Sequence, residues 1–228
     1  MRHVFLVSLL AFSVWVGITP AAGCPPGGTP PPVGAAQRQV ANLDGGDGPS
    51  TLWVGQFRDG DGHSNREVGV STASGANSDV QISSASPMPL TSLAIHGANN
   101  GGYHIIVSDG PSARLYTFAA CRLAAVVDRE GAPFVFDLQN LRGHGTGVGC
   151  SDLGPPSIGR RLVGLQPLQT NTGQWTVRRT EIDLNGTAAT IGPSDTVTAT
   201  SARDPAAASA QTISCGDLTI GQDGVQQP

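Results

Sequence analysis

The chain repeats one local pattern four times: an apolar strand end, then a loop of Asp, Asn, Gly or Pro, then, in the first three copies, a second strand. The copies begin at Val40, Leu93, Val148 and Ile213, so successive starts lie 53, 55 and 65 residues apart. A period near 55 residues that holds about four strands is the size of a β-propeller blade. The pattern therefore predicts an all-β, propeller-like array of about 55-residue repeats. About three full units fit, so we expect the array to be incomplete or open, unless residues 213–224 complete the first unit at ring closure.

Between the loops, short apolar or alternating runs predict strands, and the 31 Gly and 17 Pro residues suit the many turns. These runs span 51–57, 67–72, 79–84, 90–97, 103–108, 113–118, 121–127, 133–138, 161–166, 175–184 and 187–192. One short C-terminal helix is predicted where Asp204 can cap the first turn and Pro205 can open it.

Three regions follow from the composition along the chain. Residues 1–23 have a positive start, an apolar centre and a small-residue exit at Ala21-Ala22-Gly23, which is typical of a secretory signal. Residues 24–36 are rich in Pro and Gly and predict an extended, solvated tether. Residues 37–228 are predicted to form the all-β domain.

The residue that follows the signal is Cys24, and this order resembles the lipobox of bacterial lipoproteins, in which the Cys carries the lipid. The resemblance implies a lipid anchor at Cys24, on the outer face of the cytoplasmic membrane, with no other membrane contact. Ala21 departs from the pattern, which usually has Leu there. The alternative is ordinary cleavage near Ala21 to Gly23, with secretion and an unmodified Cys24 thiol.

The remaining cysteines are Cys121, Cys150 and Cys215. In an exported protein we expect at least one disulfide bond among these three. Cys121–Cys150 would close the shorter loop, whereas Cys150–Cys215 would join matching positions of two repeats. The spacing does not choose between them.

The loops also carry a resemblance to a known family. The segment VANLDGGDGPSTLWVG from Val40, and the Asp-Gly-Asp-Gly core of residues 55–70, resemble the FG-GAP/VCBS repeats of bacterial surface proteins and integrin α-chain propellers. Such loops bind Ca²⁺ because alternate carboxylates and amides on a tight turn converge their oxygen atoms. The resemblance implies calcium at two candidate loops, with Asn42, Asp44 and Asp47 in the first and Asp59, Asp61 and Glu67 in the second. Turns without metal are the alternative.

Catalytic patterns are weak. His144-Gly145-Thr146 is similar to the segment that holds the catalytic His of subtilisin-like proteases, but the chain has no matching Ser turn and almost no helices. No Gly-x-Ser-x-Gly elbow occurs. We therefore assign no catalytic residue.

The net charge of −4 and the absence of a basic run make nucleic acid an improbable partner. We expect a non-enzymatic envelope or surface protein that binds an extracellular protein or carbohydrate through its loops. The alternatives are a secreted enzyme acting on polysaccharide and a purely structural envelope protein.

Overall fold

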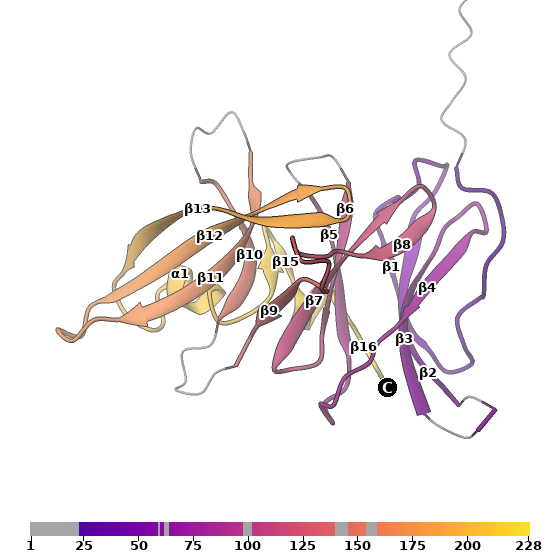
Figure 1. Ribbon diagram of the computed structural model, residues 1–228, viewed down its shortest axis with the longest axis horizontal. Helices are drawn as coiled ribbons and strands as arrows, with labels where there is room; N and C mark the ends of the chain where they lie inside the picture. The colour runs from indigo at the N-terminus through magenta and orange to yellow at the C-terminus, as the bar shows by residue number, and fades with distance from the viewer. Residues whose placement is uncertain (1–22, 59, 62–63, 98–101, 140–145, 154–158) are drawn as a thin grey trace, which may run out of the picture.

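The computed structural model describes residues 23–58, 60–61, 64–97, 102–139, 146–153 and 159–228, and within them the chain is mostly antiparallel β-structure (Figure 1). None of its sheets closes on itself. The first sheet has the order β1 (Ala36–Val40), β2 (Ser50–Arg58), β3 (Ser64–Ser71), β4 (Asn77–Gln81). The second has the order β16 (Val225–Gln226), β5 (Thr91–His96), β6 (Tyr103–Ser108), β7 (Ser112–Ala119), β8 (Arg122–Ala125), and β9 (Val135–Asp137) also pairs with β7. The third has the order β10 (Gly147–Ser151), β11 (Arg161–Gln169), β12 (Trp175–Asn185), β13 (Ala188–Ala199).

The remaining elements are short and lie near the C-terminus. They are the helix α1 (Pro205–Ser209), the strand pair β14 (Ser214–Cys215) and β15 (Leu218–Thr219), and the helix α2 (Ile220–Asp223). No helix in the described part of the chain has the length and apolar character needed to cross a membrane.

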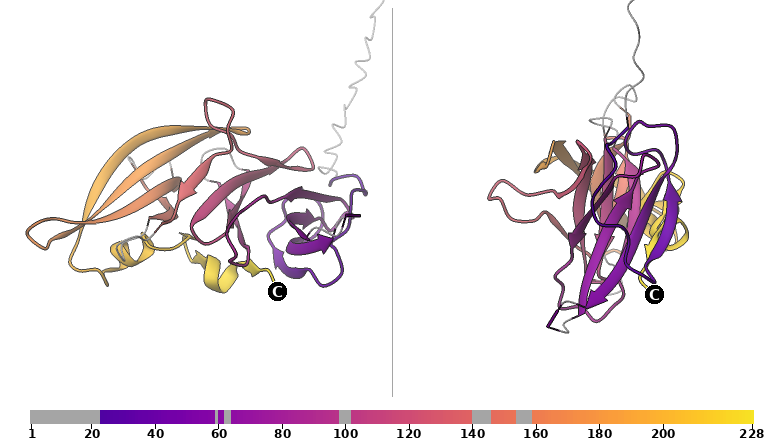
Figure 2. Two further views of the ribbon diagram at one scale, coloured as in Figure 1. Left: turned by 60° about the horizontal axis from the view of Figure 1, so that its bottom comes forward. Right: turned by 90° about the vertical axis from the view of Figure 1, so that its right-hand side faces the viewer.

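The three sheets follow one another along the long axis of the molecule, with the second sheet between the other two (Figures 1 and 2). Strand β6 shows how the second sheet packs against both neighbouring sheets, because its successive side chains point alternately into two different apolar clusters. Ile105 and Val107 join the apolar cluster shared with the first sheet, whereas Ile106 joins the cluster shared with the third. A strand buried on both faces needs a continuous apolar run, which YHIIVS supplies.

Short segments of the chain pack on the outer faces of the two end sheets, the first and the third. Ala207 and Ala210, in and after α1, pack against Val163 and Val177 of the third sheet. On the first sheet, Gly55 lies so close to Pro32 that an added Cβ would be 2.5 Å from the proline Cγ. The end sheets are thus covered by single segments and not by each other, and the prediction of a propeller is not confirmed.

Each predicted strand run overlaps a strand of the structure, most of them within a few residues at the ends, but β13 continues seven residues beyond the predicted 187–192. The repeat starts also have a structural meaning, because Val40, Leu93 and Val148 lie in β1, β5 and β10, the strands that begin the three meanders. The predicted helix is present as α1, and the Asp204 carboxylate accepts a hydrogen bond from the backbone N–H of Ala206 at 3.0 Å. Helix α2 was not predicted.

The N-terminal segment differs from the predicted tether. It is exposed along most of its length, but it is fastened at its start: Cys24 is buried, and Gly27 exchanges backbone hydrogen bonds with Gly75 and Asn77 of 3.1 and 2.7 Å. Together with the contact of Pro32, these bonds hold the segment against the first sheet and do not leave it a free spacer. The part of the predicted signal before Gly23 lies outside the described residues.

Two disulfide bonds join distant parts of the chain. Cys150 pairs with Cys215, which confirms one of the two predicted alternatives, and Cys121 pairs with Cys24, a combination that spacing did not suggest. The Cα atoms of the pairs are 4.7 and 5.5 Å apart respectively. Both bonds indicate an oxidising environment outside the cytoplasm. The sulfur of Cys24 is consumed by its disulfide bond, so this structure leaves no thiol there for a lipid.

Candidate functional site

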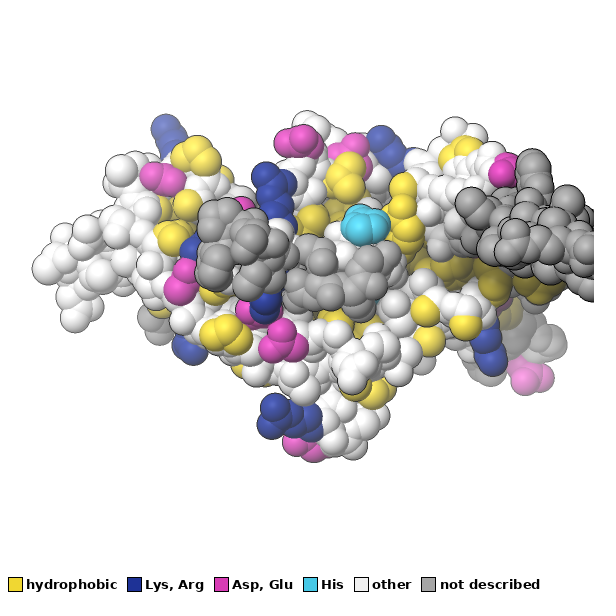
Figure 3. Space-filling view, turned by 90° about the horizontal axis from the view of Figure 1, so that it is seen from above, with side chains coloured by type: hydrophobic (Ala, Val, Ile, Leu, Met, Phe, Trp, Pro, Cys, Tyr) yellow, Lys and Arg dark blue, Asp and Glu magenta, His cyan; other side chains and the backbone are white. Residues whose placement is uncertain are grey.

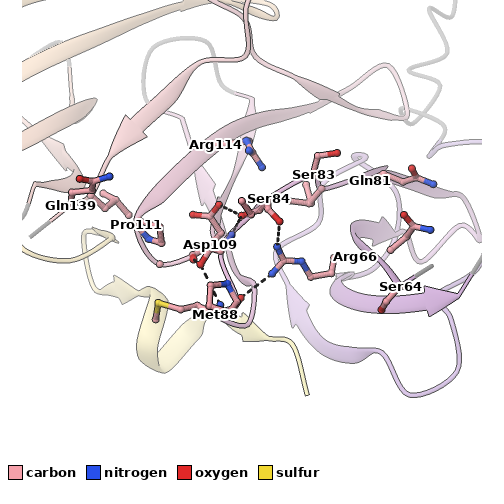
Figure 4. A pocket seen from close by; sticks show the side chains of 17 residues that line it. Ser64, Arg66, Gln81, Ser83, Ser84, Met88, Asp109, Pro111, Arg114 and Gln139 are labelled. Carbon is pink, nitrogen blue, oxygen red and sulfur yellow. Dashed lines mark hydrogen bonds between the residues drawn. The ribbon is translucent and has the colours of Figure 1, made fainter. Parts of the chain in front are cut away.

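A groove of about 1170 Å³ opens where the first and second sheets meet (Figure 4). Its walls come from β3, from the segment after β4, and from the turn between β6 and β7 together with the start of β7. Most of its lining side chains are hydroxyl, amide or guanidinium groups. The lining residues are Ser64, Asn65, Arg66, Gln81, Ile82, Ser83, Ser84, Ala85, Ser86, Pro87, Met88, Asp109, Gly110, Pro111, Arg114, Leu138 and Gln139.

Two arginines occupy positions that face inward on the sheets. In β3, Arg66 shares a face with Val68 and Val70, and both valines are buried in the core between the sheets. In β7, Arg114 shares a face with the buried Tyr116 and Phe118. The apolar core ends at this edge of the sheets. Beyond it, the two guanidinium groups lie on facing walls of the groove.

Hydrogen bonds to backbone carbonyls hold Arg66 in place. Its Nη1 donates to the carbonyl oxygen of Met88 at 2.9 Å and its Nη2 to that of Ser84 at 3.1 Å (Figure 4). These bonds also fix the 82–88 segment, which follows β4 and is not itself a strand, as one wall of the groove. Arg114, by contrast, is half-buried, and its guanidinium group makes no hydrogen bond or ion pair within the described residues, although its charge acts on Asp109.

Asp109 is the acid of the groove, and its oxygen atoms have internal partners. It accepts bonds from the backbone N–H of Ser112 at 3.0 Å, from the Ser112 hydroxyl at 2.8 Å, and from the Ser84 hydroxyl. Burial raises the pKa of Asp109, but the bonds from Ser84 and Ser112 and the charge of Arg114 outweigh burial and leave that pKa below its ordinary value. An ionised, fully bonded Asp109 closes the turn between β6 and β7 and is poorly suited to donating a proton.

The first predicted calcium loop is held together by its own backbone. The Asn42 side-chain oxygen accepts bonds from the N–H groups of Asp44 and Gly45 at 3.1 and 2.8 Å. Asp44 accepts bonds from the N–H groups of Gly46 and Cys24 at 3.0 and 3.1 Å, and from the Ser74 hydroxyl at 2.9 Å. These donors satisfy the oxygen atoms without an ion. Burial raises the pKa of Asp44, and the bonds to its oxygens lower it further than burial raises it.

The third predicted ligand of that loop, Asp47, is exposed and does not join the other two through any bond that the structure describes. Calcium in this loop stays a prediction, and binding would require Asn42 and Asp44 to give up N–H donors in favour of the ion.

In the second predicted calcium loop, the two ligands that the structure describes lie apart. Asp59 lies outside the described residues, Asp61 is exposed in the hairpin turn, and Glu67 lies well along β3. Since Ser64 pairs with Arg58 where the hairpin closes, Glu67 is three residues further along, about 10 Å from the turn at ~3.3 Å per residue. Glu67 is buried, and its pKa is raised by burial and by the charge of Asp79. Within the described ranges, no three His, Cys, Asp or Glu side chains gather closely enough to hold a metal.

Sequence reasoning missed the groove. Its signals were present but ambiguous: Arg66 and Arg114 stand at inward positions of alternating strands, and part of the serine-rich run 83–86 falls at the end of the predicted strand 79–84. Which face of a strand points inward becomes clear only when the partner sheet is known.

His144, the centre of the rejected protease pattern, lies outside the described residues. On the face that Figure 3 shows, charged side chains stand singly or in small groups of both signs.

Comparisons of the chain with protein-family models, with curated proteins and with solved structures find no match. The resemblance to FG-GAP/VCBS repeats therefore stays a prediction based on the loops at 40–70.

Proposed function

We propose that this protein is a non-enzymatic binding protein of the extracytoplasmic space, and that the groove between the first and second sheets binds an acidic oligosaccharide. The observation that carries the proposal is the pair of guanidinium groups, Arg66 and Arg114, at inward positions where the core ends. Guanidinium groups match the planar geometry of carboxylates and form charge-assisted hydrogen bonds with them.

The charge of the groove supports an anionic ligand. Arg66, Arg114 and Asp109 are its charged lining residues, so the groove has one net positive charge in a chain whose net charge is −4. The positive charge of Arg114 is available to a ligand, because its side chain forms no ion pair in the described structure. Asp109, the nearby carboxylate, is already bonded to Ser84 and Ser112.

The remaining lining supports a saccharide. Ser83, Ser86, Gln81 and Gln139 offer hydroxyl and amide groups that can both donate and accept hydrogen bonds, as a polyhydroxylated ligand needs. A volume of about 1170 Å³ exceeds the usual ~300–1,000 Å³ of small-molecule pockets, which favours an oligomer over a monosaccharide. Hydrolysis is less favoured, because the carboxylate in the groove is committed to structural bonds and a glycosidase needs two acids.

The proposal is tested by measuring the dissociation constants of a uronic-acid oligosaccharide, a neutral oligosaccharide of the same length and a Glu-rich peptide by titration calorimetry. We expect binding of the first, weakened by added salt, and little binding of the neutral one. Arg114→Gln should raise the dissociation constant roughly 10-fold, the loss of about one charge-assisted bond. The matched control is Arg129→Gln, at an exposed position away from the groove lining.

Equal affinity for the acidic and neutral saccharides, or equal loss in the two arginine variants, would contradict the proposal. Preference for the Glu-rich peptide would reassign the groove to a protein partner. The scaffold is consistent with an open, propeller-like array in which each repeat is one four-stranded meander, and this relation also remains a proposal.

A further inference from the structure

Both the backbone nitrogen and the sulfur of Cys24 have bonding partners in the folded protein. Its backbone nitrogen donates to Oδ2 of Asp44 at 3.1 Å, and its sulfur is bonded to Cys121 at the turn between β7 and β8. The residue is only 4% exposed and belongs to the apolar cluster between the first and second sheets. Cys24 is therefore an integral part of the folded domain.

The carboxylate that receives the Cys24 nitrogen is held rigidly. Asp44 also accepts the Ser74 hydroxyl at 2.9 Å and the N–H of Gly46 at 3.0 Å, and these bonds aim Oδ2 at the Cys24 nitrogen. The same three residues surround Gly23. A Cβ there would lie 3.1 Å from the Asp44 oxygen, 3.2 Å from the Gly46 Cα and 3.3 Å from the Ser74 Cβ. The peptide group between Gly23 and Cys24 thus lies against a fixed carboxylate.

Residues 21–23 have the small side chains that an export peptidase requires before its cleavage point, with Ala21 and Gly23 at the two selective positions. Hydrolysis after Gly23 adds the hydroxyl of water to the Gly23 carbonyl carbon and its proton to the Cys24 nitrogen. The new amine, with an ordinary pKa of ~7.7–8.0, takes a further proton at neutral pH. The uncharged N–H that faces Asp44 would then become an ammonium group at the same place.

We propose that the mature protein begins at Cys24, that its amino-terminal ammonium pairs with Asp44, and that its sulfur stays in the bond to Cys121. Removal of the signal then replaces the neutral N–H donor with a charged one, so that a hydrogen bond to the carboxylate becomes an ion pair and stabilises the processed chain. Lipid attachment would need the sulfur that Cys121 holds, and acylation of the nitrogen would remove the charge that Asp44 faces. The lipobox-like order at residues 21–24 accordingly marks a cleavage point and not a lipid anchor.

The first test is the intact mass of the protein exported from a bacterial host with its own residues 1–23. We expect a chain of 205 residues that starts at Cys24, with two disulfide bonds and no further mass. A non-reducing peptide map should contain the Cys24 peptide linked to the Cys121 peptide. A lipid increment on Cys24, or an N-terminus at another residue, would overturn the proposal.

The second test separates the ammonium pair from the role of Asp44 in its own turn. Asp44→Asn is made in a chain that starts at Cys24 and in one that retains Ala21-Ala22-Gly23, both with verified disulfide bonds. We expect the substitution to lower Tm by roughly 2–6 °C more in the first chain, since only there does a charged donor face residue 44. Asp47→Asn, at an exposed carboxylate of the same loop, is the matched control and should change Tm little in either chain. An equal fall for Asp44→Asn in both chains would refute the ammonium pair.

Discussion

Gly69→Ala tests the packing of the first sheet directly, because Gly69 of β3 lies opposite Trp53 of β2 and the indole covers it. A Cβ at position 69 would lie 2.2 Å from Cζ2, 2.4 Å from Cε2 and 2.8 Å from Cη2 of Trp53. Ordinary contacts begin near 3.4 Å, so the ring would have to move by about 1.2 Å. Trp53 is fully buried and cannot move without disturbing its neighbours.

The magnitude lies between two limits. Inserting a methyl group into a packed core costs about 1–3 kcal/mol, and losing a buried Trp altogether costs about 3–5 kcal/mol. We expect Gly69→Ala to lower the free energy of unfolding by about 3 kcal/mol. For a chain of this size, each kcal/mol lowers Tm by about 2–4 °C, which corresponds to a fall of roughly 6–12 °C.

The assay is urea and thermal unfolding followed by circular dichroism, with Gly164→Ala as the matched control. Gly164 is also a strand glycine, but its Cβ would approach nothing nearer than Phe136 at 4.0 Å. That substitution should be neutral or slightly stabilising, since Ala restricts the unfolded chain more than Gly does. Gly69→Ala should also cost much less in a Trp53→Leu background, with a coupling energy above about 1 kcal/mol. Equal effects of the two Gly→Ala changes, or no coupling, would refute the packing described here.

Three further predictions concern the second sheet and the first loop. Burial, with a smaller contribution from His96, lowers the pKa of His104 from 6.5 to about 4. Between these pH values the unfolded chain binds more protons than the native state does. The free energy of unfolding should therefore fall by about 3 kcal/mol as the pH falls from 6.5 to 4. His104→Phe should remove that part of the acid sensitivity in urea melts at pH 7, 5.5 and 4, and an unchanged slope would contradict the assignment. Ala120 and Cys121 form the two-residue turn between β7 and β8 with φ of 48° and 63°, so Ala120→Gly should stabilise the protein by about 1 kcal/mol, and a fall in Tm would argue against this turn. The resemblance predicts calcium in the first loop, so millimolar calcium after EDTA treatment should raise Tm by several degrees and Asp44→Ala should abolish the rise, whereas an unchanged Tm would mean that the internal donors of Asp44 exclude the ion.

The sequence by itself determined most of the local structure of this protein. Alternating side chains located the strands, and the Asp/Asn/Gly loops marked the first hairpin of each meander at Val40, Leu93 and Val148. The helix start followed from Asp204 and Pro205. These features rest on interactions between residues close in the chain, which a sequence displays directly.

Only the tertiary structure decided the features that join distant residues. The partners Cys24 and Cys121 are 97 residues apart, and nothing in their spacing indicates that the N-terminal segment returns to the β7–β8 turn. The groove depends on Arg66 and Arg114 facing each other from different sheets, and an alternating strand does not reveal which of its faces another sheet will cover. Asp44 illustrates the same limit: its Asp-Gly context predicts a metal ligand, but only the folded structure shows that Cys24 and Ser74, distant in the sequence, donate hydrogen bonds to its oxygen atoms.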